Sequence, residues 1–296
     1  MTGRVLRRRG VVLATLAALL SAVLVACADD DEPTPLVSSS PLLAMPVDSL
    51  PLTLADTVDY RVDTLSPRAS GLITGTVQYE GALPPDSLVR PTHDLHICRP
   101  IPDAPLVGTS DGVGDAVVWL LGVASGAADT APRRVQLKLE DCAITPRVQR
   151  APVGATLLVR SADAMNARLR FVDVEPDAAP TTSPTADSSR PPTLRPPRAL
   201  VPLGDAGAVV PLTSVLQTPG LVEVRDDRHP WIRGWIAVAP HPYVAITDGT
   251  GRFSLDAVPA GRYVLVTWHE RLGRLAMPVH VDAGIETRVR VLLPKR

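Results

Sequence analysis

The amino-acid sequence predicts an all-β protein made of two β-sandwich modules. Apolar and polar residues alternate with a period of two in many short segments, clearest at 134–140 and 285–293 and also assigned at 115–121, 233–239 and 262–268. Turn-forming pairs such as Asp248-Gly249 separate many of these segments. Beyond the first 27 residues no segment shows a clear helical period, and 31 Pro and 20 Gly favour short strands joined by turns.

The composition excludes several classes of protein. Hydrophobic residues make up 45% of the 296 residues and charged residues 21%, which is enough for one or two globular cores and unlike a collagenous or wholly disordered chain. The formal net charge is -1 at pH 7, without the excess of Lys and Arg typical of nucleic-acid-binding domains. We therefore expect no nucleic-acid partner.

Residues 1–26 have the pattern of a secretory signal peptide. Four arginines precede an uncharged run over 11–26, which is shorter than the roughly 20 apolar residues of a transmembrane helix. Leu24-Val25-Ala26-Cys27 resembles a bacterial lipobox, in which the cysteine is lipidated and begins the mature chain. The alternative is a plain signal peptide with a chance cysteine. The resemblance implies a lipid-anchored protein of the bacterial cell envelope, facing the periplasm or the surface, on either membrane.

The two other cysteines, Cys98 and Cys142, are an even pair in an oxidising compartment. This predicts a disulfide between them, with two buried free thiols as the alternative. Two segments have compositions that cannot form a hydrophobic core. The first, 27–70, is predicted to be a disordered tether. The Pro-rich stretch 175–198 is predicted to be a disordered loop within one domain or a linker between two.

The segment 247–270, TDGTGRFSLDAVPAGRYVLVTWHE, resembles carboxypeptidase regulatory-like domains, which are small transthyretin-like β-sandwiches. The segment 71–84, GLITGTVQYEGALP, resembles the first strand of the same module. The resemblance implies that 71–125 and 239–294 form one sandwich, with a second domain inserted between them. Strand 115–121 is assigned to the first sandwich, with the sheet of the inserted domain as the alternative.

The segments 153–170 and 221–235 resemble bacterial cupredoxin-like (plastocyanin-like) proteins, some of which are joined to a carboxypeptidase regulatory-like module. In that family a strand ending in Cys-x-x-His-Pro-Trp-Met supplies three copper ligands, and an earlier Asn-x-Asp-x-x-x-His supplies the fourth. The resemblance implies a cupredoxin-like domain over 132–238, interrupted by the loop 175–198.

Most of those copper ligands are replaced in this chain. Asp226 stands at the Cys position, Ile232 at the Met position and Ala167 at or near the first His, so that His229 alone is retained. A blue-copper site needs a thiolate and two imidazoles. The resemblance therefore implies a degenerate copper site, with no metal and no other cofactor. A different metal held by Asp226, His229 and His241 is the alternative.

We expect structural roles for the remaining candidate residues. Trp231 and Trp235 are expected to fill a core, with a sugar-binding surface as the alternative. His93 and His96 are expected to lie in a solvated loop rather than to bind a metal. His269 and Glu270 are expected to have a structural role rather than to act as an acid–base pair. Known hydrolase and nucleotide-binding motifs are absent from the sequence.

Together these features predict a lipid-anchored, extracytoplasmic protein that is not an enzyme. Its expected role is binding or structural, with the membrane and an unknown protein or glycan as partners. Two alternatives remain open at this point. One is a copper-binding electron-transfer protein with a remodelled site, and the other is a carbohydrate-binding or hydrolase accessory module.

Overall fold

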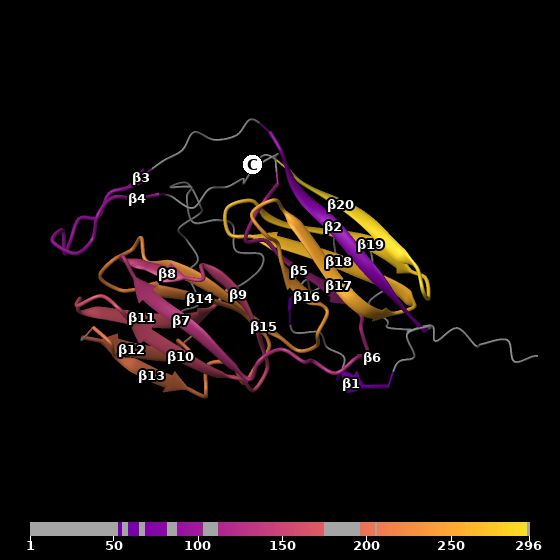
Figure 1. Ribbon diagram of the computed structural model, residues 1–296, viewed down its shortest axis with the longest axis horizontal. Coiled ribbons are helices and arrows are strands. Elements are labelled where there is room, and N and C mark those ends of the chain that lie inside the picture. The colour runs from indigo at the N-terminus through magenta and orange to yellow at the C-terminus, as the bar shows by residue number, and fades with distance from the viewer. Residues whose placement is uncertain are drawn as a thin grey trace, which may run out of the picture. The chain divides into compact units, whose positions relative to one another are not determined.

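The computed structural model describes residues 53–54, 59–64, 69–81, 88–102, 112–174, 196–204 and 206–294. Every regular element in these ranges that is longer than one residue is a β-strand, which confirms the predicted all-β class (Figure 1). No helix of these ranges is long and apolar enough to cross a membrane. The predicted signal peptide 1–26, Cys27 and most of the loop 175–198 lie outside the described residues.

One sandwich, called the split sandwich below, takes its strands from both ends of the chain. One of its sheets has the order β17-β2-β20 and the other the order β16-β5-β18-β19. In Figure 1 the purple β2 lies beside the yellow β20, and the two strands pair in parallel. The strand bounds are β2 Ser70–Glu80, β5 Val117–Leu121, β16 Val244–Ile246, β17 Arg252–Pro259, β18 Gly261–His269, β19 Gly273–Val281 and β20 Glu286–Pro294.

The second sandwich, called the inserted sandwich below, is formed by the chain between β5 and β16. Its sheets have the orders β13-β10-β7-β8 and β12-β11-β14-β15-β9, and the parallel pairs are β7 with β10 and β9 with β15. The strand bounds are β7 Arg134–Glu140, β8 Ala143–Thr145, β9 Val148–Pro152, β10 Thr156–Ser161, β11 Ala167–Asp173, β12 Ala199–Leu203, β13 Val209–Leu212, β14 Gly220–Asp226 and β15 Arg233–Ala239.

Two short ladders lie outside these sheets. The strand β1 (Arg61–Val62) pairs in parallel with β6 (Ser125–Gly126), and β3 (Leu88–Val89) pairs with β4 (Ile101–Pro102). The second ladder closes an excursion of the chain between β2 and β5. That excursion carries Cys98, which packs in the core of the inserted sandwich.

The turn before β17 shows how local chemistry ends a strand. The side chain of Asp248 accepts hydrogen bonds from the backbone N–H groups of Thr250 and Arg252, at 2.8 and 3.0 Å. Gly251 has a φ of +78°, and a Cβ there would lie 2.3 Å from the carbonyl oxygen of Val77. Glycine is therefore required at this corner both by the backbone conformation and by the close approach of β2.

Three hydrophobic cores hold the described residues together. Each sandwich has a core of its own, and a third core lies between the sheet of β5 and β18 and the sheet of β14 and β15. We call it the shared core. Its members include three tryptophans and many small aliphatic side chains: Leu54, Val117, Trp119, Leu121, Val148, Leu221, Trp235, Ala237, Ala239, Val244, Val264, Val266 and Trp268.

The shared core explains why β5, β15 and β18 do not follow the predicted alternation. In β5, Val118 and Leu120 enter the core of the split sandwich, whereas Val117, Trp119 and Leu121 enter the shared core. Every residue of this strand is buried. The period-two assignment of these segments was wrong because strands covered on both faces read as continuous apolar runs.

Part of the predicted tether 27–70 is built into this fold. Leu54 is 4% exposed and belongs to the shared core. Tyr60 packs edge-on against Tyr243 and donates a hydrogen bond to the carbonyl of Ala127, while the next residues form β1. The described residues of 53–64 therefore act as a strap across both sandwiches and not as a free linker.

Two histidines, His241 and His269, are buried. Burial lowers the pKa of His241 to about 4, and Arg150 adds to the effect. Burial likewise lowers the pKa of His269 to about 4, with Arg271 and Arg147 contributing. The Nδ1 atom of His269 accepts backbone N–H groups from Arg271 and Leu272, both at 3.3 Å, which fits a neutral ring.

We predict that mild acid destabilises the protein through these two rings. Unfolding returns each pKa from about 4 to its usual 6.5, so that the unfolded state binds more protons below pH 6.5. Above pH 6.5 neither ring reduces the free energy of unfolding. By about pH 5 each ring should reduce it by roughly 2 kcal/mol. Urea unfolding above pH 6.5 and at about pH 5 should show this decrease in the free energy of unfolding.

The variant His269→Gln provides the control for this prediction. Glutamine can still accept a backbone hydrogen bond but does not titrate, so the acid-induced loss should be smaller than in the native chain by roughly 2 kcal/mol. An identical loss in the native chain and the variant would show that His269 does not carry the effect.

Candidate functional site

The structure brings together, at one end of the inserted sandwich, the four positions that were predicted to be remnants of a copper site. Asp226 ends β14, and its backbone N–H donates to the carbonyl of Ile232 at 3.1 Å. The backbone N–H of Ile232 donates in turn to the carbonyl of His229 at 2.8 Å. Ala167 begins β11, and the next backbone N–H, that of Arg168, donates to the carboxylate of Asp226.

The carboxylate of Asp226 is buried and fully engaged. Its Oδ1 atom accepts the backbone N–H groups of Arg228 and His229, both at 2.8 Å, and lies 2.7 Å from Nδ1 of His229. Its Oδ2 atom accepts the N–H of Arg168. The side chain has no exposed surface. These bonds offset the cost of removing a charged carboxylate from water.

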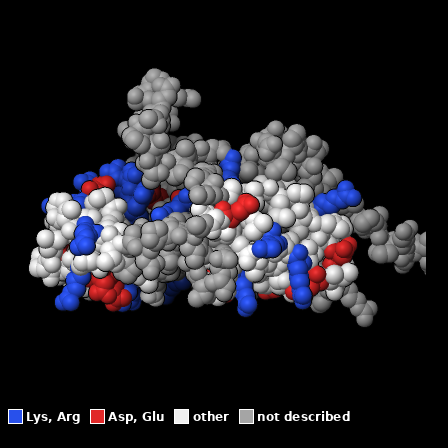
Figure 2. Space-filling view, turned by 90° about the horizontal axis from the view of Figure 1, so that it is seen from above, with Lys and Arg blue, Asp and Glu red and all other residues white. Residues whose placement is uncertain are grey.

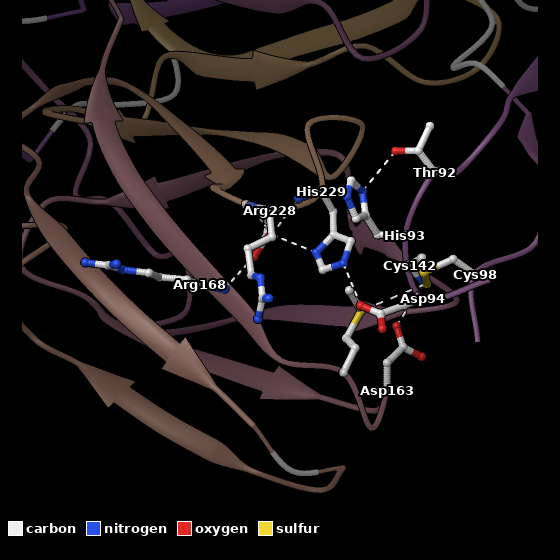
Figure 3. Close-up of polar contacts among 11 residues, drawn as sticks. Thr92, His93, Asp94, Cys98, Cys142, Asp163, Arg168, Arg228 and His229 are labelled. Carbon is white, nitrogen blue, oxygen red and sulfur yellow. Dashed lines mark hydrogen bonds and ion pairs between the residues drawn. A yellow bond between two sulfur atoms is a disulfide. The ribbon is translucent and has the colours of Figure 1, made fainter. Parts of the chain in front are cut away.

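The second ring nitrogen of His229 also faces a carboxylate. Its Nε2 atom lies 2.8 Å from Oδ2 of Asp94, and Figure 3 shows the ring directed toward that residue. A neutral imidazole has a single N–H, so these contacts require an imidazolium or a proton on one of the two carboxyl groups. In either case both ring nitrogens of His229 are occupied by hydrogen bonds.

Asp94 was not among the residues predicted from the sequence. It lies in the excursion between β3 and β4, 135 positions before His229. Its carbonyl accepts the N–H groups of Ile97 and Cys98, both at 2.8 Å, and its φ is 49°. The only local signal was the motif HDLHIC, in which the histidines rather than the aspartate attract attention.

The predicted disulfide between Cys98 and Cys142 is confirmed and holds this loop in place. The two Cα atoms are 5.4 Å apart, and both residues are buried. Asp163 anchors the other side, because its carboxylate accepts the backbone N–H groups of Asp141 and Cys142 at 3.0 and 2.8 Å. Figure 3 shows the disulfide next to Asp94. The bond therefore ties the loop that supplies Asp94 to the inserted sandwich.

The two candidate binding aromatics belong to different cores. Trp231 is half-buried, and His93 lies nearly parallel to its ring, with the centroids 6.5 Å apart. Trp235 is 5% exposed and contacts Trp268 in the shared core. A single sugar platform made of both rings does not form, since the ring of Trp235 is covered. His96 is exposed, as expected for a loop.

The structure places the other candidates outside this cluster. His241 packs beside Tyr60 and Tyr243, with ring centroids 5.7 Å apart in both cases. Glu270 makes two hydrogen bonds to the guanidinium of Arg147, at 2.8 and 3.0 Å. Burial raises the pKa of Glu270, and Arg147 opposes that shift. In the described ranges no three His, Cys, Asp or Glu residues are arranged to hold a metal ion.

No family model and no curated protein matches the sequence. Solved structures that resemble parts of the chain include a copper nitrite reductase from Thermus scotoductus SA-01, with 21% identity, a TM-score of 0.24 and coverage of 38% of this chain and 25% of that one. An auracyanin from Roseiflexus castenholzii has 19% identity, a TM-score of 0.27 and coverage of 37% and 99%. A purple cupredoxin from Nitrosopumilus maritimus has 14% identity, a TM-score of 0.24 and coverage of 35% and 97%.

We predict that Asp226→Ala destabilises the protein by roughly 3–5 kcal/mol, the range observed when one partner of a buried ion pair is removed. The change leaves the N–H groups of Arg168, Arg228 and His229 without their acceptor. Asp227→Ala is a matched control, because its partly exposed carboxylate pairs with Arg170 at the surface. Urea unfolding at neutral pH measures both. Equal losses would contradict the structural role given to Asp226.

Proposed function

We propose that this protein is a lipid-anchored envelope protein whose inserted domain is a cupredoxin-like sandwich without a copper site, and that its role is binding rather than electron transfer. The observation that carries the proposal is the bridge from Asp226 through His229 to Asp94. This bridge occupies the retained histidine and the residue that stands in place of the copper-ligating cysteine.

The chemistry of these side chains supports the loss of a redox role. A type 1 copper centre depends on a thiolate and two imidazoles. Ala167 and Ile232 have no donor atoms, and Asp226 offers oxygens that already accept three backbone N–H groups. A metal that took this carboxylate would leave those buried groups unsatisfied, at about 1–3 kcal/mol each. A metal ion at Asp226 would therefore compete with backbone hydrogen bonds that stabilise the fold.

The buried disulfide supports a place outside the cytoplasm, because structural disulfides persist mainly in oxidising compartments. The proposal of a lipid anchor at Cys27 is supported by the lipobox-like sequence that precedes this residue. The non-enzymatic assignment rests on the absence of a catalytic motif from the sequence. In addition, His269 and Glu270 are engaged in structural hydrogen bonds.

Copper titration of the chain without residues 1–27 tests the proposal. We expect weak binding at most, no intense visible absorption in the presence of Cu(II), and the same isotherm for His229→Ala. Calorimetry and absorption spectroscopy provide the two readouts. Tight one-to-one binding that is lost in His229→Ala would overturn the proposal and make copper handling at a remodelled site the leading function.

A further inference from the structure

Three arginines stand in a row across the outward face of the five-stranded sheet. Arg170 of β11 lies directly opposite Arg225 of β14, and Arg225 lies directly opposite Arg233 of β15. The neighbouring residues Leu169 and Val224 point to the other face, into the core of the inserted sandwich. Like charges directly opposite each other on one face of a sheet are destabilising. The row therefore costs stability unless negative charge, from neighbouring side chains or from a ligand, offsets the repulsion.

Acidic neighbours neutralise only part of this charge. Asp227 makes two hydrogen bonds to Arg170, at 2.9 and 3.0 Å, and lies 3.7 Å from Arg168. Glu223 binds Arg233 at 2.5 Å and lies 3.8 Å from Arg225. Among the described residues these four guanidinium groups form ion pairs with two carboxylates, and Glu270 also interacts electrostatically with Arg233.

Three of these arginines are more exposed than the acidic side chains. The exposed fractions of the Arg168, Arg225 and Arg233 side chains are 57%, 43% and 42%, against 11% for Glu223 and 27% for Asp227. We call the surface formed by Arg168, Arg170, Arg225 and Arg233 the arginine face. Figure 2 shows Lys and Arg side chains on both halves of the face that it draws, with Asp and Glu side chains among them.

The surroundings of the arginine face limit the shape of its ligand. Farther along the same outward face, Leu221, Trp235 and Ala237 are covered by the split sandwich in the shared core. The split sandwich therefore rises beside the arginine face and keeps a flat membrane surface away from it. A narrow, extended molecule can still lie along the row. Adjacent strands are about 4.8 Å apart, so the backbones that carry the three arginines of the row recur at about that spacing.

We propose that the arginine face binds a linear anionic polysaccharide, whose carboxylate or sulfate groups recur along the chain at about the spacing of the row. Guanidinium groups bind such anions with paired, charge-assisted hydrogen bonds. The inference gives a ligand class to the binding role proposed above. It concerns residues outside the Asp226–His229–Asp94 bridge, so the copper titration and the test below can fail independently.

The test compares binding of polygalacturonate and dextran sulfate to the native chain and to Arg168→Gln/Arg225→Gln, both without residues 1–27. Calorimetry at about 10 mM salt, where charge screening is weak, should detect binding to at least one polymer. The double variant should bind about tenfold or more weakly. Added salt should weaken native binding. Urea unfolding checks that the variant is folded, and the removal of repulsion should leave its stability unreduced.

Arg288→Gln is the matched control. Arg288 lies on β20 of the split sandwich, its side chain is 81% exposed, and it pairs with Glu286. Its replacement should leave polymer binding unchanged. The proposal is overturned if neither polymer binds, if the double variant binds as tightly as the native chain, or if Arg288→Gln weakens binding equally. Tighter binding to polyglutamate or to phosphatidylglycerol vesicles than to both polysaccharides would also overturn it.

Discussion

Apolar packing between the two sandwiches is the constraint on which the rest of this molecule depends. A buried Val or Leu contributes about 1.5–3 kcal/mol, whereas an exposed ion pair contributes about 1 kcal/mol or less. The shared core, with Trp119, Trp235 and Trp268 among its members, therefore determines how the sandwiches pack. The pair Arg147–Glu270 and the strap containing Leu54 follow from that packing.

At one end of the inserted sandwich, buried side chains from three segments of the chain form one polar network. Asp226 and His229 satisfy each other and three backbone N–H groups, and Asp94 closes the second side of the ring. The disulfide Cys98–Cys142 reduces the freedom of the loop that delivers Asp94. The result is a closed polar network, and such a network stabilises the fold when its members are satisfied.

Charge is distributed unevenly between the inside and the outside of the five-stranded sheet. On its inner side the carboxylate of Asp226 is bound by backbone N–H groups and by the imidazole of His229. On its outer side the guanidinium groups outnumber the carboxylates that hold them. The first arrangement needs no external ligand, whereas the second leaves positive charge at the surface. The proposed ligand therefore binds on the outer side of the sheet and not at the Asp226–His229–Asp94 bridge.

The sequence by itself determined the all-β class and the disulfide pair, because alternation and cysteine count can be read along the chain. The resemblance of 221–235 to cupredoxin-like proteins predicted that Asp226 stands at the end of a strand, and it does end β14. Only the tertiary structure decided that β5 is buried on both faces, that Leu54 belongs to a core and that Asp94 meets His229. Periodicity shows that a face is apolar but not what covers it. A contact between residues 135 positions apart leaves no spacing pattern in the chain, since folding alone brings the two segments together.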